Sequence, residues 1–162
     1  MTRMLNRNFF QDRGFFLDLL ELELKRSLRY QSFTSVLLIE IPARKFQTSK
    51  TTSFLERVVT SLSSQIRETD IIGTTKENTI TVILLNCDKR SSSEIANRVS
   101  CWTLEYFGSD SSDTISGSRL GVGVACFPTH ATDSAHLLNA ASEMLETSRS
   151  RRQPEAQSRL QP

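Results

Sequence analysis

The stretch "RETDIIGTTKENTITVILLN", residues 67–86, contains two short apolar segments separated by a polar turn. The segments at 70–73 and 79–86 are rich in β-branched residues, whereas residues 74–78 between them are polar. This pattern predicts a β-hairpin. An arginine and an aspartate three positions apart open the stretch, so it either carries part of a binding site or holds only a helix end followed by a hairpin.

The segments around the hairpin alternate between strand and helix patterns. "FTSVLLIEI", residues 33–41, is almost continuously apolar until a proline stops it, which predicts a central strand covered on both faces. A later strand at 118–127 contains Gly121 and Gly123, which indicate close packing or a bulge. Apolar residues at helical spacing predict four helices: one capped by Asp12 and running to Tyr30, one from 51 to near Arg67, one at 91–107 behind a serine cap, and one at 133–149 capped by Thr132 or Asp133.

The predicted order is helix, strand, helix, strand, strand, helix, strand, helix. This order predicts an α/β (α+β) sandwich, in which a mostly antiparallel sheet of about five strands is flanked by helices on both faces. We assign residues 10–150 to the domain and residues 1–9 to an N-terminal lead-in. Residues 151–162 have almost no apolar content and are predicted to be a disordered tail.

The composition restricts the class of protein. A chain of 162 residues with 38% hydrophobic content is long enough for one packed core. Its net charge of +2 gives no general field for nucleic acid. The three cysteines are widely spaced and form no CxxC pattern, which argues against a disulfide framework and a zinc site and fits a reducing cytoplasm. No apolar run reaches the roughly 20 residues of a membrane span.

Four local strings, in order, carry a resemblance to a known family. They are "DRGFFLDLLELELKRSLRY", "SVLLIEI", "RLGVGVA" and "LLNAASEML". In this order and spacing they resemble the GGDEF domain of diguanylate cyclases, which condense two GTP into cyclic di-GMP. The resemblance covers roughly residues 10–150 and implies a fold similar to the palm domain of adenylyl cyclases.

The signature hairpin departs from the family pattern. The five positions of the GGDEF motif fall on Lys76, Glu77, Asn78, Thr79 and Ile80. Side chains replace both glycines that let the backbone approach the nucleotide, and we expect Lys76 and Glu77 to be a solvated turn pair. The resemblance implies a metal-binding carboxylate at the third position, where Asn78 is a neutral and weaker ligand.

Other parts of the family's GTP site are also missing. Glu40 retains the place of the first-strand aspartate, but the next aspartate of that string is a proline here. The segment 44–54, "RKFQTSKTTSF", lacks the strings that hold guanine and ribose. The fourth helix lacks the family's phosphate lysine, and Arg149 is the nearest equivalent. We therefore expect no diguanylate cyclase activity, no catalytic residue, no magnesium and no other metal or cofactor.

A second site of the family is retained. Many cyclases carry a product-inhibition motif, RxxD, that ends five residues before the signature hairpin, and "RETD" ends at Asp70 in that register. "IANRV" places Arg98 where the family takes another arginine from the following helix. The resemblance thus implies that Arg67, Asp70 and Arg98 bind cyclic di-GMP. Arginine forks suit guanine and phosphate edges, and a carboxylate suits the donors of guanine.

Plainer interpretations stay open. Arg67 and Asp70 are also consistent with a local ion pair at a helix end, and Arg98 with an ordinary exposed helix residue. A ligand-independent dimerisation or docking scaffold of a bacterial signalling protein is the alternative function, and residual GTP binding is a third. The partners implied are cyclic di-GMP, a second copy of the chain with or without a bridging ligand, and an effector in exopolysaccharide, motility or pilus machinery.

Overall fold

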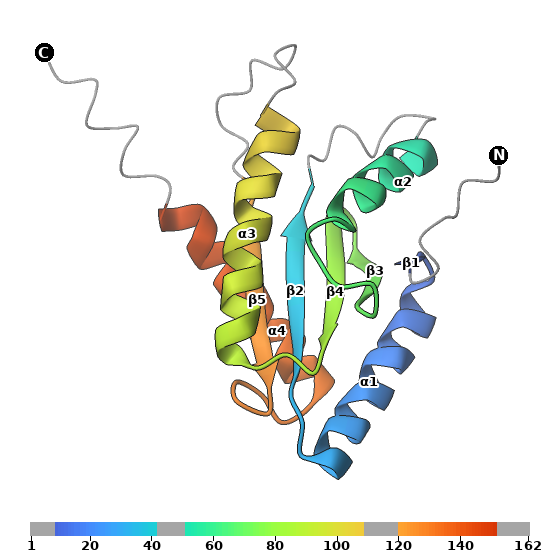
Figure 1. Ribbon diagram of the computed structural model, residues 1–162, viewed down its shortest axis with the longest axis vertical. Coiled ribbons are helices and arrows are strands. Elements are labelled where there is room, and N and C mark those ends of the chain that lie inside the picture. The colour runs from blue at the N-terminus through green and yellow to red at the C-terminus, as the bar shows by residue number, and fades with distance from the viewer. Residues whose placement is uncertain (1–8, 42–50, 109–119, 152–162) are drawn as a thin grey trace, which may run out of the picture.

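The computed structural model describes residues 9–41, 51–108 and 120–151. Within these ranges the chain forms five strands and four helices (Figure 1). The elements are β1 (Phe9–Phe10), α1 (Arg13–Tyr30), β2 (Thr34–Glu40), α2 (Thr51–Leu62), β3 (Ile71–Lys76), β4 (Thr79–Leu85), α3 (Lys89–Gly108), β5 (Val122–Phe127) and α4 (Ser134–Arg151).

The strands form one sheet in the order β1-β3-β4-β2-β5. β2 is antiparallel to both of its neighbours, β3 is antiparallel to β4, and β1 is parallel to β3. All residues of β2 except Glu40 at its end are buried. The prediction of a central strand covered on both faces is therefore confirmed.

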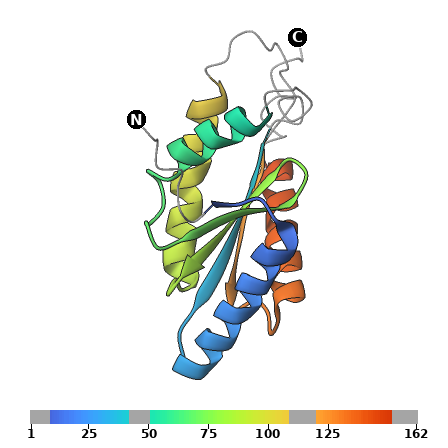
Figure 2. The same ribbon diagram turned by 90° about the vertical axis from the view of Figure 1, so that its right-hand side faces the viewer.

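Helices cover both faces of the sheet, as predicted. Figure 2 shows α2 and α3 on one side and α1 and α4 on the other. Alternate residues of β2 point to opposite faces, so that Leu37 and Ile39 pack under α2 and α3, and Val36 and Leu38 pack under α1 and α4. Each fully buried aliphatic side chain contributes about 1.5–3 kcal/mol, so the central strand anchors both halves of the core.

Aspartates cap three of the helices. Asp12 accepts a hydrogen bond from the Phe15 N–H at 3.0 Å, and Asp133 accepts one from the His136 N–H at 2.9 Å, which confirms both predicted caps. The predicted serine cap of the third helix is wrong. Asp88 caps α3 by accepting from the Ser91 N–H at 2.8 Å, so that helix begins two residues earlier than predicted.

The second helix ends earlier than the apolar spacing predicts. α2 stops at Leu62 rather than near Arg67, although Ile66 continues the helical spacing. The Ser63 hydroxyl donates to the Val59 carbonyl, and the Ser64 hydroxyl donates to the Ser61 carbonyl, both at 2.7 Å. Serine hydroxyls compete with the backbone bonds of a helix in this way, and the chain leaves the helix at these residues.

The hairpin is confirmed with a shorter turn than predicted. β3 continues to Lys76, and the turn consists of Glu77 and Asn78 alone. Asn78 has φ 61°, in the left-handed region that asparagine tolerates better than most residues. Lys76 and Glu77 are exposed, as expected of a solvated turn pair.

The chain ends differ in part from the prediction. Phe9 and Phe10 form β1 at the boundary between the predicted lead-in and the domain, where a strand of two residues leaves no periodicity to detect. α4 continues to Arg151, the first residue of the predicted tail. The rest of that tail, and most of the segment 44–54, lie outside the described residues. None of the helices in the described ranges is long and apolar enough to cross a membrane.

Candidate functional site

The loop between α2 and β3 is organised around the carboxylate of Asp70. Its Oδ2 accepts a hydrogen bond from the Arg67 N–H at 2.9 Å, and its Oδ1 accepts one from the Leu85 N–H of β4 at 3.2 Å. The Asp70 side chain is 0% exposed. Burial raises the pKa of this carboxyl above its ordinary value, although the two N–H donors and the Arg67 guanidinium act in the opposite direction. Asp70 thus ties the loop to the end of β4.

Arg67 combines a buried backbone contact with an accessible head group. Its backbone N–H is held by Asp70, and its side chain Nε lies 3.9 Å from Asp70 Oδ2. The side chain is nevertheless 49% exposed. Because only one edge of the guanidinium faces Asp70, donors remain available to a ligand.

Arg98 reaches the same loop from α3. Its Nε donates to the Gln65 carbonyl at 3.0 Å, and its Nη2 donates to that carbonyl as well. Arg98 is exposed. The structure therefore places Arg98 of α3 against Gln65, two residues before Arg67 in the same loop.

The three residues of the predicted ligand site differ in their exposure to solvent. Arg67 and Arg98 are exposed, whereas the Asp70 carboxylate is enclosed and already accepts two backbone hydrogen bonds. In this conformation two exposed guanidinium groups, one in the loop and one held against it by the Gln65 carbonyl, are available to an anion or a purine edge, whereas the Asp70 carboxylate is buried. Direct contact between Asp70 and a ligand stays a prediction.

The degenerate signature positions lie beside the end of β2. Glu40 stands opposite Thr79 in the register of β2 and β4, and the Ile41 N–H donates to the Asn78 carbonyl at 2.7 Å. Ile80 is fully buried in the core under α2 and α3. The hairpin tip and Glu40 are therefore neighbours.

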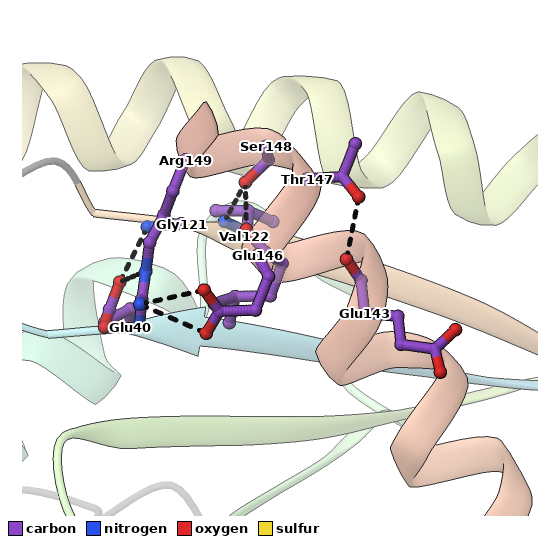
Figure 3. A network of polar contacts seen from close by, with 9 residues as sticks. Glu40, Gly121, Val122, Glu143, Glu146, Thr147, Ser148 and Arg149 are labelled. Carbon is purple, nitrogen blue, oxygen red and sulfur yellow. Dashed lines mark hydrogen bonds and ion pairs between the residues drawn. The ribbon is translucent and has the colours of Figure 1, made fainter. Parts of the chain in front are cut away.

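Glu40 is engaged by an arginine from the end of α4, as Figure 3 shows. Arg149 Nε donates to Glu40 Oε2 at 2.8 Å, and its Nη2 donates to Oε1. The Gly121 N–H also donates to Oε2 at 3.0 Å, and Arg149 Nη1 lies 3.1 Å from a carboxylate oxygen of Glu146. This paired arrangement is the strong form of an arginine–carboxylate contact. We call Glu40, Arg149 and Glu146 the α4 clamp.

The residues at this position do not fit a divalent metal ion. A magnesium site needs several converging oxygen ligands, and both oxygens of Glu40 are held by donors. In the described ranges no three His, Cys, Asp or Glu side chains are grouped so that they could hold an ion. The expectation that the chain uses no magnesium stays a prediction.

The contact between Glu40 and Arg149 was not foreseen from the sequence. From the sequence, Arg149 is the nearest equivalent of a phosphate-binding lysine, and Glu40 retains the place of a metal-binding aspartate. The two residues are 109 positions apart, and at such a separation the sequence does not indicate that two opposite charges form an ion pair. Only the register of β2 with β5, and the packing of α4 on β5, bring them together.

Comparisons with known proteins agree with this fold. Residues 1–154 match the family model described as "Diguanylate cyclase, GGDEF domain". No curated protein matches the chain.

Similar solved structures include three bacterial proteins. The GGDEF domain of YfiN (TpbB) from Pseudomonas aeruginosa is 18% identical with a TM-score of 0.68, and the match covers 93% of this chain and 90% of that one. The active GGEEF domain of a diguanylate cyclase from Vibrio cholerae is 15% identical with a TM-score of 0.68, covering 87% and 92%. The diguanylate cyclase SiaD from P. aeruginosa, solved with its activator SiaC, is 19% identical with a TM-score of 0.58, covering 86% and 55%. At these identities the likeness shows the fold alone.

Proposed function

The chain belongs to the GGDEF domain family, and on that premise we propose that it is a catalytically inactive member that acts as a receptor for cyclic di-GMP. The observation that carries the proposal is that Arg98, from α3, is held against the loop that contains Arg67. Arg98 binds the Gln65 carbonyl, and Arg67 begins the RxxD motif two residues later.

The chemistry of the ligand suits these groups. Cyclic di-GMP presents two guanines, each with the O6 and N7 acceptors that an arginine fork can pair with, and two phosphates. A guanidinium can also stack on a purine face. Hydrogen bonds to charged groups contribute about 1.5–3 kcal/mol each, so a few of them with stacking reach the roughly 8 kcal/mol of micromolar binding.

In this proposal Asp70 positions Arg67. Its oxygens hold the Arg67 and Leu85 N–H groups, and its charge lies under the Arg67 guanidinium. If Asp70 also accepts from a guanine edge, as expected from the motif, the loop must open to expose it. Asp70→Asn keeps the shape of the side chain and removes its charge, so its effect on binding separates the charge from the fold of the loop.

Two features support the loss of synthesis. Asn78 offers a neutral amide where the family has a metal-binding carboxylate, and the α4 clamp engages both oxygens of Glu40. Mutually paired charges at a potential metal position leave little negative charge for a cation. We expect no cyclic di-GMP when the purified chain is incubated with GTP and magnesium.

Isothermal titration with cyclic di-GMP tests the receptor role. The unaltered chain should bind with an affinity in the micromolar range, and both Arg67→Ala and Arg98→Ala should weaken binding at least tenfold. Arg90→Ala is the matched control, because Arg90 also lies on α3, is 90% exposed and pairs only with the neighbouring Glu94 in the part of the chain described. No heat with the unaltered chain, or equal affinities in all variants, would reject the proposal.

The enclosure of Asp70 favours a second candidate, a docking or dimerisation module that needs no ligand. A buried carboxylate that holds two backbone N–H groups is also what a purely structural loop requires. One structural neighbour, SiaD, was solved bound to a protein activator. This candidate predicts no heat on titration with cyclic di-GMP and unchanged partner binding in Arg67→Ala.

A further inference from the structure

β5 is an edge strand, and three of its backbone groups lack partners within the described residues. The Glu40 N–H donates to the Gly121 carbonyl, so Gly121 faces β2 and alternate residues beyond it do too. Val122, Val124 and Cys126 therefore direct their N–H and C=O groups away from the sheet. The Val122 carbonyl and both groups of Val124 have no partner among the residues described.

Both ends of this edge are closed by side chains. The Val122 N–H donates to the Ser148 hydroxyl at 3.2 Å, and the Cys126 N–H donates to His130 Nδ1 at 2.8 Å. The His130 N–H returns to the Cys126 carbonyl at 2.7 Å. Such caps are a common way to protect a sheet edge, and here they leave a short opening centred on Val124.

The opening forms the floor of a groove between α3 and α4. The groove has a volume of about 340 Å³, and its lining consists of neutral side chains only: Ser93, Ala96, Asn97, Ser100, Val122, Val124, Met144, Thr147 and Ser148. Most of these are small. Val124 at the floor of the groove is partly exposed, whereas Val122 is 7% exposed. Met144 is 49% exposed, and Leu104, which continues the same side of α3 at helical spacing, is 57% exposed.

We propose that this groove, which we call the β5 groove, binds an extended, uncharged peptide segment of a partner protein as an added strand beside β5. The segment would exchange a pair of backbone hydrogen bonds with Val124, the partly exposed residue of this edge. Addition of a strand to a sheet edge is a general mode of peptide recognition, in which backbone bonds give affinity and side-chain contacts give specificity.

The shape and charge of the groove select this occupant. Side chains of α3 and α4 line the groove on the two sides of β5, so an occupant has to reach Val124 between two helices. We take a single extended chain as the occupant because the unpaired groups of this edge are those of a strand backbone. A lining without formal charge gives no compensation for a buried Lys, Arg, Asp or Glu, so the segment should carry small or apolar side chains.

Selection from a random nonapeptide display library, with the purified full chain as bait, tests the proposal. We expect uncharged peptides without proline at the central positions. Val124→Pro removes only the outward-facing N–H of this residue, a change that an edge strand tolerates, and it should abolish binding of the peptides. Asn97→Trp fills the groove from α3 and should also abolish it. Glu105→Trp, exposed on α3 but outside the groove lining, is the matched control and should bind like the unaltered chain.

The outcomes are decisive in both directions. Circular dichroism and thermal melting establish whether each variant is folded. If Val124→Pro does not fold, Asn97→Trp alone tests the proposal. Peptides that bind the unaltered chain and Glu105→Trp but neither groove variant support the proposal. A library that yields no binder, binders rich in charged residues, or binders that Asn97→Trp retains would overturn it.

Discussion

At the scale of single residues, two carboxylates of this chain respond to opposite environments. Asp70 is buried, which raises its pKa, whereas Asp88 at the start of α3 accepts the Ser91 N–H, which lowers its pKa. Between the ordinary value of 3.8 and the raised pKa of Asp70, the folded chain binds more protons than the unfolded one. The contribution of Asp70 to the free energy of unfolding therefore falls as pH rises through this interval.

Urea unfolding of Asp70→Asn and Asp88→Asn across the acid range checks this sign. The stability of the unaltered chain relative to Asp70→Asn should decrease as pH rises from about 4. Relative to Asp88→Asn it should increase as pH rises toward the ordinary value of 3.8 and level off above it, because a lowered pKa contributes stability that is lost as pH falls through the lowered value. Slopes of the same sign in both comparisons would contradict the assigned environments.

A second prediction at this scale concerns the contribution of the α4 clamp to the free energy of unfolding. Arg149→Met keeps most of the side chain's length but leaves the Glu40 carboxylate, which is 20% exposed, with the Gly121 N–H as its remaining described donor. We expect a loss of roughly 1–2 kcal/mol in unfolding free energy, since Arg149 is itself partly exposed. Glu40→Gln combined with Arg149→Met should recover part of that loss in a double-mutant cycle. Glu146→Gln is the control, because the Glu146 side chain is 65% exposed, and its effect should be small.

At the scale of elements, the packing of α4 on β5 depends on Gly123. A Cβ at this position would lie 2.1 Å from the Ala141 carbonyl oxygen and 2.5 Å from the Leu145 nitrogen. These are backbone atoms of α4, so the helix would have to move. Gly123→Ala should therefore lower the free energy of unfolding by about 1–3 kcal/mol or more, measured by urea denaturation.

Gly14→Ala provides the opposite case on α1. Among the described residues its Cβ would meet only Asp12 Oδ1, at 3.5 Å. Alanine there should stabilise the chain by about 0.5–1 kcal/mol, because glycine loses more backbone freedom in a helix. Equal effects of the two substitutions would mean that the close approach of α4 to β5 does not limit the packing.

Element types were predictable from the sequence where the apolar pattern was long, and element ends were not. The continuous run of β2 and the spacing in α1 identify both elements, and Asp12 marks the start of α1. The end of α2 was missed because Ile66 extends its apolar spacing past Leu62 while Ser63 and Ser64 bond back to the helix. β1 was missed because two residues carry no period.

The candidate site also has features that the sequence predicts and features that only tertiary packing determines. The sequence motif locates Arg67, Asp70 and Arg98, and the structure brings all three to the loop after α2. What the motif does not contain is the direction of the Asp70 carboxylate, which is set by the Leu85 N–H of β4, 15 positions away. The α4 clamp is likewise a product of tertiary packing, since its members become neighbours only when α4 packs on β5.

At the scale of the whole molecule, a ligand that binds only the folded chain stabilises it by mass action. Cyclic di-GMP at 100 times its dissociation constant should add about 2.7 kcal/mol to the free energy of unfolding. For a chain of 162 residues this corresponds to a rise of about 5–10 °C in Tm. At the same ligand concentration the rise should fall to about half or less in Arg67→Ala, which binds at least tenfold more weakly, and be retained in Arg149→Met, because the α4 clamp and the loop after α2 are built from different elements. GTP with magnesium should leave Tm unchanged in the unaltered chain, since Glu40 is paired with Arg149.

Two outcomes would contradict this account. A rise in Tm with GTP but none with cyclic di-GMP would place the nucleotide at the hairpin and contradict the receptor role. Equal rises with cyclic di-GMP in Arg67→Ala and the unaltered chain would support the ligand but reject the arginines as its site.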